Sequence, residues 1–160
     1  MRFLTADYLF PLDRSPIKNG VLQISNKGEV INVFSNNKSF PKTEIEHYSG
    51  VLCPGFINSH CHLELSHLAM CYKQGSGLLE FIKSIKKRKE HTINDIKNSI
   101  EIAENQLLLN GVVGVGDVCN TSDTLEIKCK NNITYYNFIE TFSVYENEVV
   151  KSISLAEELR

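Results

Sequence analysis

The stretch that decides the fold is PGFINSHCHLELS, residues 54–66, in which a short apolar run ends in two histidines separated by one residue. The run predicts a β-strand, and side chains two positions apart on a strand point to the same side. His60 and His62 would therefore present two imidazoles to one side, while Cys61 points to the other. Because imidazole is a common ligand of zinc and other divalent transition metals, the pair predicts a chelating metal site. The alternative is an unliganded pair, since short histidine pairs also occur by chance.

Downstream of Pro54 the pattern alternates between strands and helices, which indicates βα units and a parallel sheet. We expect strands at residues 55–58, 112–118 and 133–142, and helices at residues 77–89, 92–109, 121–130 and 146–160. In the second of these helices the apolar residues recur at spacings of three and four, which predicts one buried stripe. Thr92 is the expected N-cap with Asp95 at the capping-box position, and Asn110-Gly111 is the expected C-terminal stop.

Residues 1–53 show a different pattern, with short apolar runs broken by turn residues. This pattern predicts a small antiparallel β domain. We therefore expect two domains, one over residues 1–53 and an α/β domain over residues 54–160.

The lead Pro54-Gly55-Phe56-Ile57 followed by histidine, any residue and histidine resembles the first-strand signature of the amidohydrolase superfamily. The small β domain at residues 1–53 resembles that of the family, and GVVGVGD at 111–117 resembles its second strand. The segment HLELS after the first histidine resembles the deaminase and chlorohydrolase branch, which includes aminodeoxyfutalosine deaminases. This resemblance implies a (β/α)8 TIM barrel. A complete barrel takes about 250 residues and about 105 residues follow Pro54, so the chain holds roughly the first three of eight units, a partial barrel.

The resemblance also implies a chemistry, that of a metal-dependent hydrolase acting on non-peptide C-N bonds. His60 and His62 would hold one divalent metal ion, zinc or alternatively iron, and a metal-bound water would deaminate a purine-like or nucleoside-like heterocycle. Further ligands and the general acid or base come from later strands in that family, so the active site in this chain is expected to be incomplete and inactive alone. The alternative is a catalytically inactive short protein that uses the half fold for binding or assembly.

Several polar residues near the predicted strand ends are candidates for contacts with a substrate. Glu64 would share the face of the histidines if their strand continued, and could then meet substrate or support a ligand; a solvated loop carboxylate is the alternative. Ser66 and His67 fall in the first barrel loop, and His67 is also a weak candidate for a third ligand. Asp117 and Glu140 end the second and third predicted strands, where polar groups of a barrel face its pocket.

Composition and charge exclude other classes of function. A net charge of -2 and a pI near 6.2 give no overall attraction to nucleic acid or to anionic membranes. The one basic run, at residues 83–89, is typical of a solvated helix face. No signal peptide or membrane span is evident, so we expect a cytoplasmic protein with reduced cysteines. The partner would be a small heterocyclic molecule, and the unpaired edge of the strand at 133–142 makes a homo-oligomer possible.

Overall fold

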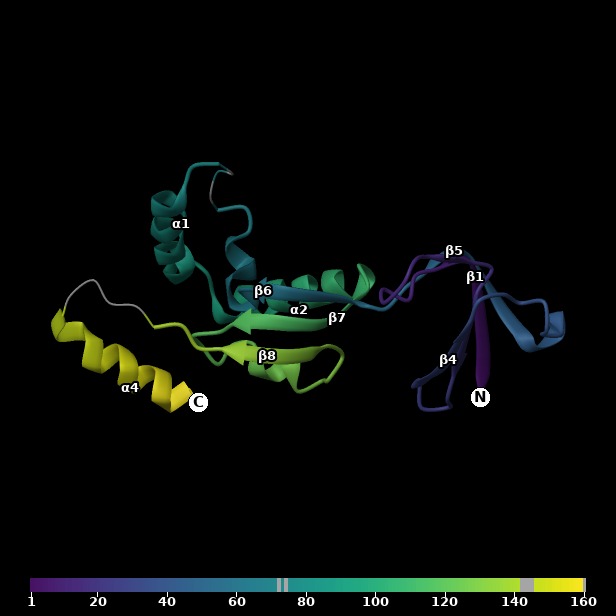
Figure 1. Cartoon of the computed structure of the whole chain (residues 1–160). Coiled ribbons are helices and arrows are strands. Elements are labelled where there is room, and N and C mark those ends of the chain that lie inside the picture. Colours follow the sequence, from purple (N-terminus) through teal and green to yellow (C-terminus); the bar gives the residue numbers. More distant parts are fainter. Residues whose placement is uncertain (72, 74, 142–145, 160) are drawn as a thin grey trace. The chain divides into compact units, whose positions relative to one another are not determined.

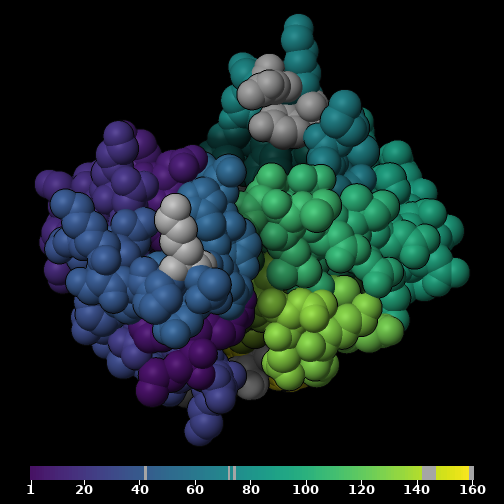
Figure 2. All heavy atoms as spheres, turned by 90° about the vertical axis from the view of Figure 1, so that its right-hand side faces the viewer, coloured from purple at the N-terminus to yellow at the C-terminus, as the bar shows by residue number. Residues whose placement is uncertain are grey.

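The computed structural model describes residues 1–71, 73, 75–141 and 146–159. These residues belong to two compact units, Met1–Pro54 and Gly55–Arg160. The first unit is drawn purple to blue and the second teal to yellow (Figures 1 and 2). Every α-helix in the described part of the chain lies in the second unit. Among the described residues, none of the helices is both long and apolar enough to cross a membrane.

The first unit is a five-stranded sheet with the order β2-β1-β3-β4, in which β5 also pairs with β1. Its strands are β1 (Arg2–Leu9), β2 (Ile17–Lys18), β3 (Val21–Ile24), β4 (Val30–Phe34) and β5 (Ile45–Leu52). The pairs β1-β2, β1-β3 and β3-β4 are antiparallel, as predicted, but β5 runs parallel to β1. The prediction of a purely antiparallel unit is wrong at this edge, because the long connection at residues 35–44 returns the chain to the start of β1.

The second unit is built on a parallel three-stranded sheet with the order β6-β7-β8 (Figure 1). Its strands are β6 (Phe56–Cys61), β7 (Val112–Val118) and β8 (Thr134–Phe138). Its helical segments are the 3-10 turn η2 (Leu63–Leu68), α1 (Leu78–Ile85), the 3-10 turn η3 (Lys86–Glu90), α2 (Ile93–Leu109), α3 (Leu125–Lys128), the 3-10 turn η4 (Glu146–Glu148) and α4 (Val149–Leu159). The mixed α/β architecture and the parallel sheet confirm what the alternation of strands and helices predicts.

Several of these elements are shorter than the sequence pattern predicts. Helix α1 gives way to a 3-10 turn after Ile85, where like charges three and four residues apart disfavour a regular α-helix. Helix α3 is a single turn, because Thr121 and Asp123 hydrogen-bond to each other and hold the chain in a loop before it. Strand β8 ends at Phe138, and the predicted ends at Phe142 and Arg160 lie outside the described residues.

Helix α2 covers one face of the sheet and packs against η2 and β7 (Figure 1). It begins as predicted: Thr92 Oγ1 accepts a hydrogen bond from Asp95 N at 3.2 Å, and the Asp95 carboxylate accepts one from Thr92 N at 3.0 Å. Its buried Ile96 and Ile100 pack against Leu63 of η2, in a cluster that also includes Ile127, Cys61 and Tyr135. We call this side of the sheet the covered face.

The opposite side, which we call the bare face, is lined by Ile57, Ser59, Gly114, Gly116, Thr134, Tyr136 and Phe138. Ile57 is 68% exposed, Tyr136 70% and Phe138 48%. Two glycines of β7 let these side chains approach the strand closely. A Cβ atom at Gly116 would stand 2.8 Å from the carbonyl oxygen of Ser59, and one at Gly114 would stand 2.9 Å from Ile57 Cδ1. The bare face is therefore closely packed within the sheet but open to solvent.

Candidate metal centre

The two histidines converge at the carboxyl end of β6. Cys61 packs into the cluster of the covered face, and the pairing of β6 with β7 shifts register between Asn58 and Cys61, so the strand is irregular where it carries His60. The two Nε2 atoms lie 3.3 Å apart, and the ring centroids lie 5.2 Å apart. Two nitrogen ligands at about 2.0–2.1 Å from a tetrahedral ion stand roughly 3.3–3.4 Å from each other. The spacing of the pair thus fits the divalent metal that the sequence resemblance implies.

The pair is not joined by a third ligand in the part of the chain that the structure describes. No group of three or more histidine, cysteine, aspartate or glutamate side chains is arranged there to hold a metal ion. His67, the candidate third ligand, is 8% exposed, and its ring packs edge-on against His91 with centroids 5.0 Å apart. Neither of its ring nitrogens has a hydrogen-bond partner among the described residues, and burial, then the nearby Arg88, lower its pKa.

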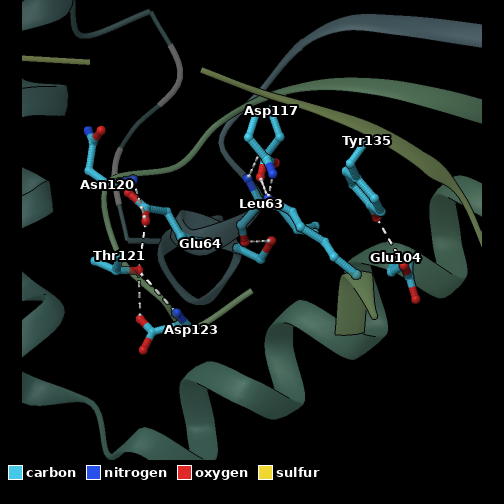
Figure 3. Close-up of polar contacts among 11 residues, drawn as sticks. Leu63, Glu64, Glu104, Asp117, Asn120, Thr121, Asp123 and Tyr135 are labelled. Atoms are coloured by element: carbon cyan, nitrogen blue, oxygen red, sulfur yellow. Dashed lines mark hydrogen bonds and ion pairs between the residues drawn. The ribbon is translucent and has the colours of Figure 1, made fainter. Parts of the chain in front are cut away.

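Glu64 lies on η2 and not on an extension of the strand, because the backbone leaves the extended conformation at His62. The premise that it shares a face with the histidines is therefore wrong. It is also not a solvated carboxylate, since the residue is only 4% exposed. Its Oε2 accepts hydrogen bonds from Asn120 N at 2.9 Å and from Thr121 Oγ1 at 2.7 Å (Figure 3). Glu64 therefore ties η2 to the loop that follows β7.

Ser66 and Glu140 take part in local backbone contacts. The Ser66 hydroxyl donates to the carbonyl oxygen of Leu63 at 2.7 Å and so closes a turn of η2. Glu140 follows β8 and is exposed, and its backbone N–H donates to Asn120 Oδ1 at 2.9 Å. The loop after β7 is thus the meeting point of two predicted site residues, Glu64 through its carboxylate and Glu140 through its backbone.

Asp117 is fully buried and faces the covered side of the sheet, not a pocket. It alternates with Gly116, which faces the other side, so the prediction that it points into a pocket is wrong. Its Oδ1 accepts from Leu63 N at 2.8 Å and its Oδ2 from Lys128 Nζ at 2.6 Å. The side chains of this ion pair are 0% and 8% exposed. Asp117 thus joins β7 to the residue immediately after His62.

A second buried pair lies beside it on the covered face. Glu104 of α2 is 1% exposed, and its Oε1 accepts a hydrogen bond from the Tyr135 hydroxyl at 3.0 Å (Figure 3). Burial, followed by this bond to Glu104, raises the pKa of Tyr135. Burial, and then the charge of Asp117, raise the pKa of the Cys61 thiol to about 11. The Lys128 ammonium stands 5.1 Å from the centre of the Tyr135 ring. Asp117, Lys128, Tyr135 and Glu104 therefore form one connected cluster on the covered face.

The loop after β7 is held from a third segment as well. Arg88 of η3 pairs with Asp123 and donates to the carbonyl oxygen of Glu64 at 3.4 Å. Thr121 Oγ1 lies 3.0 Å from Asp123 Oδ2. Sequence reasoning does not find Arg88, Lys128, Asn120 or Thr121. The one available signal is Asp117 itself, because a carboxylate within an apolar strand requires a partner when it is buried.

No protein-family model and no curated protein matches the chain. Solved structures do match. The match with Helicobacter pylori aminofutalosine deaminase in complex with methylthio-coformycin covers 99% of this chain, with a TM-score of 0.77 and 17% sequence identity. The match with a guanine deaminase from C. acetobutylicum with bound guanine covers 99% of this chain, with a TM-score of 0.64 and 17% identity. The match with an amidohydrolase from Brucella melitensis covers 86%, with a TM-score of 0.62 and 14% identity.

The chain shares its fold with these solved structures. The resemblance predicted from residues 54–66 is thus confirmed for the fold. The chain spans 40% of the aminofutalosine deaminase, 42% of the guanine deaminase and 34% of the Brucella melitensis amidohydrolase. What these proteins act on is therefore a matter for proposal in this chain.

Proposed function

We propose that the chain is the N-terminal part of a metal-dependent amidohydrolase that deaminates a heterocycle, with His60 and His62 as two of the metal ligands. The observation that carries this proposal is the 3.3 Å separation of their Nε2 atoms at the carboxyl end of β6. Barrels of this kind place their chemistry at the carboxyl ends of their strands. We further propose that residues 1–53 form a small β domain and residues 54–160 the first three units of a (β/α)8 barrel.

The residues of the pair have a defined protonation requirement. Both imidazoles must be neutral and carry their proton on Nδ1, so that the two Nε2 lone pairs converge. A bound divalent cation would supply an activated water with a pKa near neutrality. Zinc is the proposed ion, and iron is the alternative, since imidazole suits both. His60 and His62 would bind and orient, while general acid and base groups come from residues outside the described part of the chain.

The substrate class is proposed from the chemistry of the neighbours. Two of the solved structures are deaminases, one of them with bound guanine, so we propose an aminated purine-like or nucleoside-like substrate. Water would add to the carbon that bears the amino group, and ammonia would leave. The test is to measure ammonia release from aminated purines and nucleosides, with a full-length protein whose barrel contains these residues. Release only from chlorinated triazines or from cyclic amides would place the protein in another branch.

The ligand assignment is tested by zinc uptake in the chain itself. We expect weak binding, because two histidines supply half of a tetrahedral shell. Changing either His60 or His62 to alanine should remove that binding, because the remaining imidazole cannot chelate. His47→Ala is the matched control, since His47 is an exposed histidine of the first unit. Equal zinc uptake by the His60→Ala/His62→Ala double variant would show that the ligands lie elsewhere.

A second candidate function has support from the bare face. The exposed side chains of Ile57, Tyr136 and Phe138 form an apolar surface of the kind that marks binding or assembly. An inactive protein that uses this half fold for assembly would associate through that surface without binding zinc at the histidines. The zinc measurement therefore separates the two candidates.

A further inference from the structure

We propose that Asp117 and Glu64 are positioning residues for the histidine pair, acting through the backbone that follows His62. The inference rests on the proposed function, since it concerns the same metal centre. Neither carboxylate touches an imidazole in the structure. Each holds the turn η2, and η2 in turn holds His62.

The backbone that carries the two rings is irregular at two points. The pairing of β6 with β7 shifts register between Asn58 and Cys61, on either side of His60. The Nε2 atoms of His60 and His62 lie 3.3 Å apart on this segment. The chain leaves the strand at His62, whose φ of -125° and ψ of 72° differ from those of a regular strand. Groups that fix that departure therefore fix the backbone from which the His62 ring projects.

Asp117 fixes the peptide that joins His62 to Leu63. Its Oδ1 accepts the hydrogen bond of Leu63 N at 2.8 Å, so the ψ angle of His62 is held by a side chain on the neighbouring strand. The carboxylate cannot swing away, because it is 0% exposed and its other oxygen is paired with Lys128 Nζ at 2.6 Å. A rigid, buried acceptor one peptide from a ligand is well placed to define that ligand's orientation.

Glu64 fixes the next residue from a different direction. Its Oε2 accepts from Asn120 N and from Thr121 Oγ1, both in the loop after β7 (Figure 3). The start of η2 is therefore attached to β7 by Asp117 and to the following loop by Glu64. Groups that orient metal ligands without touching the metal typically change metal affinity 10–100-fold when they are removed.

Two double variants isolate the contribution of Asp117. Asp117→Asn/Lys128→Met and Asp117→Leu/Lys128→Met both remove the buried charges, but only asparagine keeps an oxygen that accepts from Leu63 N. The probe is Co2+ alone, titrated into the 160-residue chain and followed by the paramagnetic shifts of the imidazole C–H protons. We expect Co2+ binding to be about 10–100-fold weaker with leucine and close to the wild-type value with asparagine.

Glu64 is tested through its partner by a mild change that preserves folding. Thr121→Val removes the hydroxyl that donates to Glu64 and keeps the shape of the side chain. The matched control is Thr124→Val, because the buried Thr124 hydroxyl has no hydrogen-bond partner among the described residues. We expect Thr121→Val to weaken Co2+ binding about tenfold and Thr124→Val to leave it unchanged.

The outcomes distinguish this inference from the function on which it rests. If the wild-type chain shows no Co2+ shifts at the two imidazoles, the proposed metal centre is wrong. If the wild type binds and both Asp117→Leu/Lys128→Met and Thr121→Val bind equally well, the metal centre stands and the positioning role is overturned. Lower stability with unchanged Co2+ affinity also overturns it, because that is the result for residues that only support the fold.

Discussion

The two faces of the sheet β6-β7-β8 reverse the usual pattern of protein burial, in which charged groups are exposed and apolar groups are buried. The covered face buries charged groups, and Asp117 and Glu104 are 0% and 1% exposed. The bare face exposes apolar ones, with Ile57 at 68% and Tyr136 at 70%. Each of these buried carboxylates has a partner on the covered face, whereas the apolar side chains of the bare face remain about half to two-thirds exposed. In a closed barrel such inward side chains fill the interior, so the comparison supports the barrel proposal.

The largest effect should come from breaking the covered face at Lys128. Lys128→Met leaves the buried Asp117 carboxylate without its counter-charge, and removing one partner of a buried pair costs about 3–5 kcal/mol. We expect that loss in the free energy of unfolding in urea. The helical signal in circular dichroism follows this unfolding, because every α-helix in the described part of the chain belongs to the second unit.

A matched change on the surface provides the control for Lys128. Lys97 pairs with Glu126 at 2.7 Å, but the two side chains are 50% and 73% exposed. Solvent screens such a pair, so Lys97→Met should hardly move the transition. If Lys128→Met unfolds at the wild-type urea concentration, the buried pair does not stabilise the covered face.

Two adjacent tyrosines sharpen the contrast between the faces. Tyr135 points to the covered face and donates to Glu104, whereas Tyr136 points to the bare face. Tyr135→Phe leaves the Glu104 carboxylate without that donor and should cost about 1–3 kcal/mol in the free energy of unfolding. Tyr136→Phe removes an equal atom from an exposed ring and should cost almost nothing. Equal costs for the two variants would show that the faces do not differ in this way.

Alkaline pH should distinguish the same two tyrosines by a smaller effect. Burial raises the pKa of Tyr135 in the folded state, while an unfolded tyrosine ionises near pH 10. Above that pH the unfolded chain loses a proton that the folded chain keeps, so the contribution of Tyr135 to stability is unchanged below about pH 10 and falls above it. Cys61, whose pKa is raised to about 11, adds a similar decline in all variants. Urea unfolding from pH 8 to pH 11 should show a shallower decline for Tyr135→Phe than for Tyr136→Phe.

The smallest effect on stability should come from polar substitutions on the bare face. Tyr136→Ser and Phe138→Ser remove rings that contact each other, with centroids 4.9 Å apart, but that remain largely in solvent. The free energy of unfolding should change little, while self-association measured by light scattering should decrease, because exposed apolar area and strand edges promote it. A wild-type chain that stays monomeric at high concentration would count against the bare face as a contact surface.

Much of the second unit was predictable because its signals are local. The capping box of α2 needs only Thr92 and Asp95, three residues apart, and both of its hydrogen bonds form. The parallel sheet follows from the order of strands and helices. These features depend on residues that are neighbours in the sequence.

The supports of the candidate site were not predictable, because their partners are distant in the sequence. The bond from Leu63 N to Asp117 joins residues 54 positions apart, and those from Asn120 and Thr121 to Glu64 span 56 and 57. No glycine or proline marks the turn at His62. The sequence pattern therefore predicts a strand that continues past its true end, and this prediction misplaces Glu64. Partners at such separations are identified only when the strands are in place.

The distance between the histidines and their supports has a consequence for biosynthesis. A ribosome adds about 5–20 residues per second, so the 57 positions from Glu64 to Thr121 take roughly 3–11 s to synthesise. During that interval His60 and His62 have left the decoding centre while Asp117 and the loop after it do not yet exist. The nascent pair would then lie on a segment that β7 does not yet hold, and on the proposed positioning roles its 3.3 Å spacing would form when β7 pairs with β6. The proposed metal centre would therefore form late, after the residues that would bind the metal have already been made.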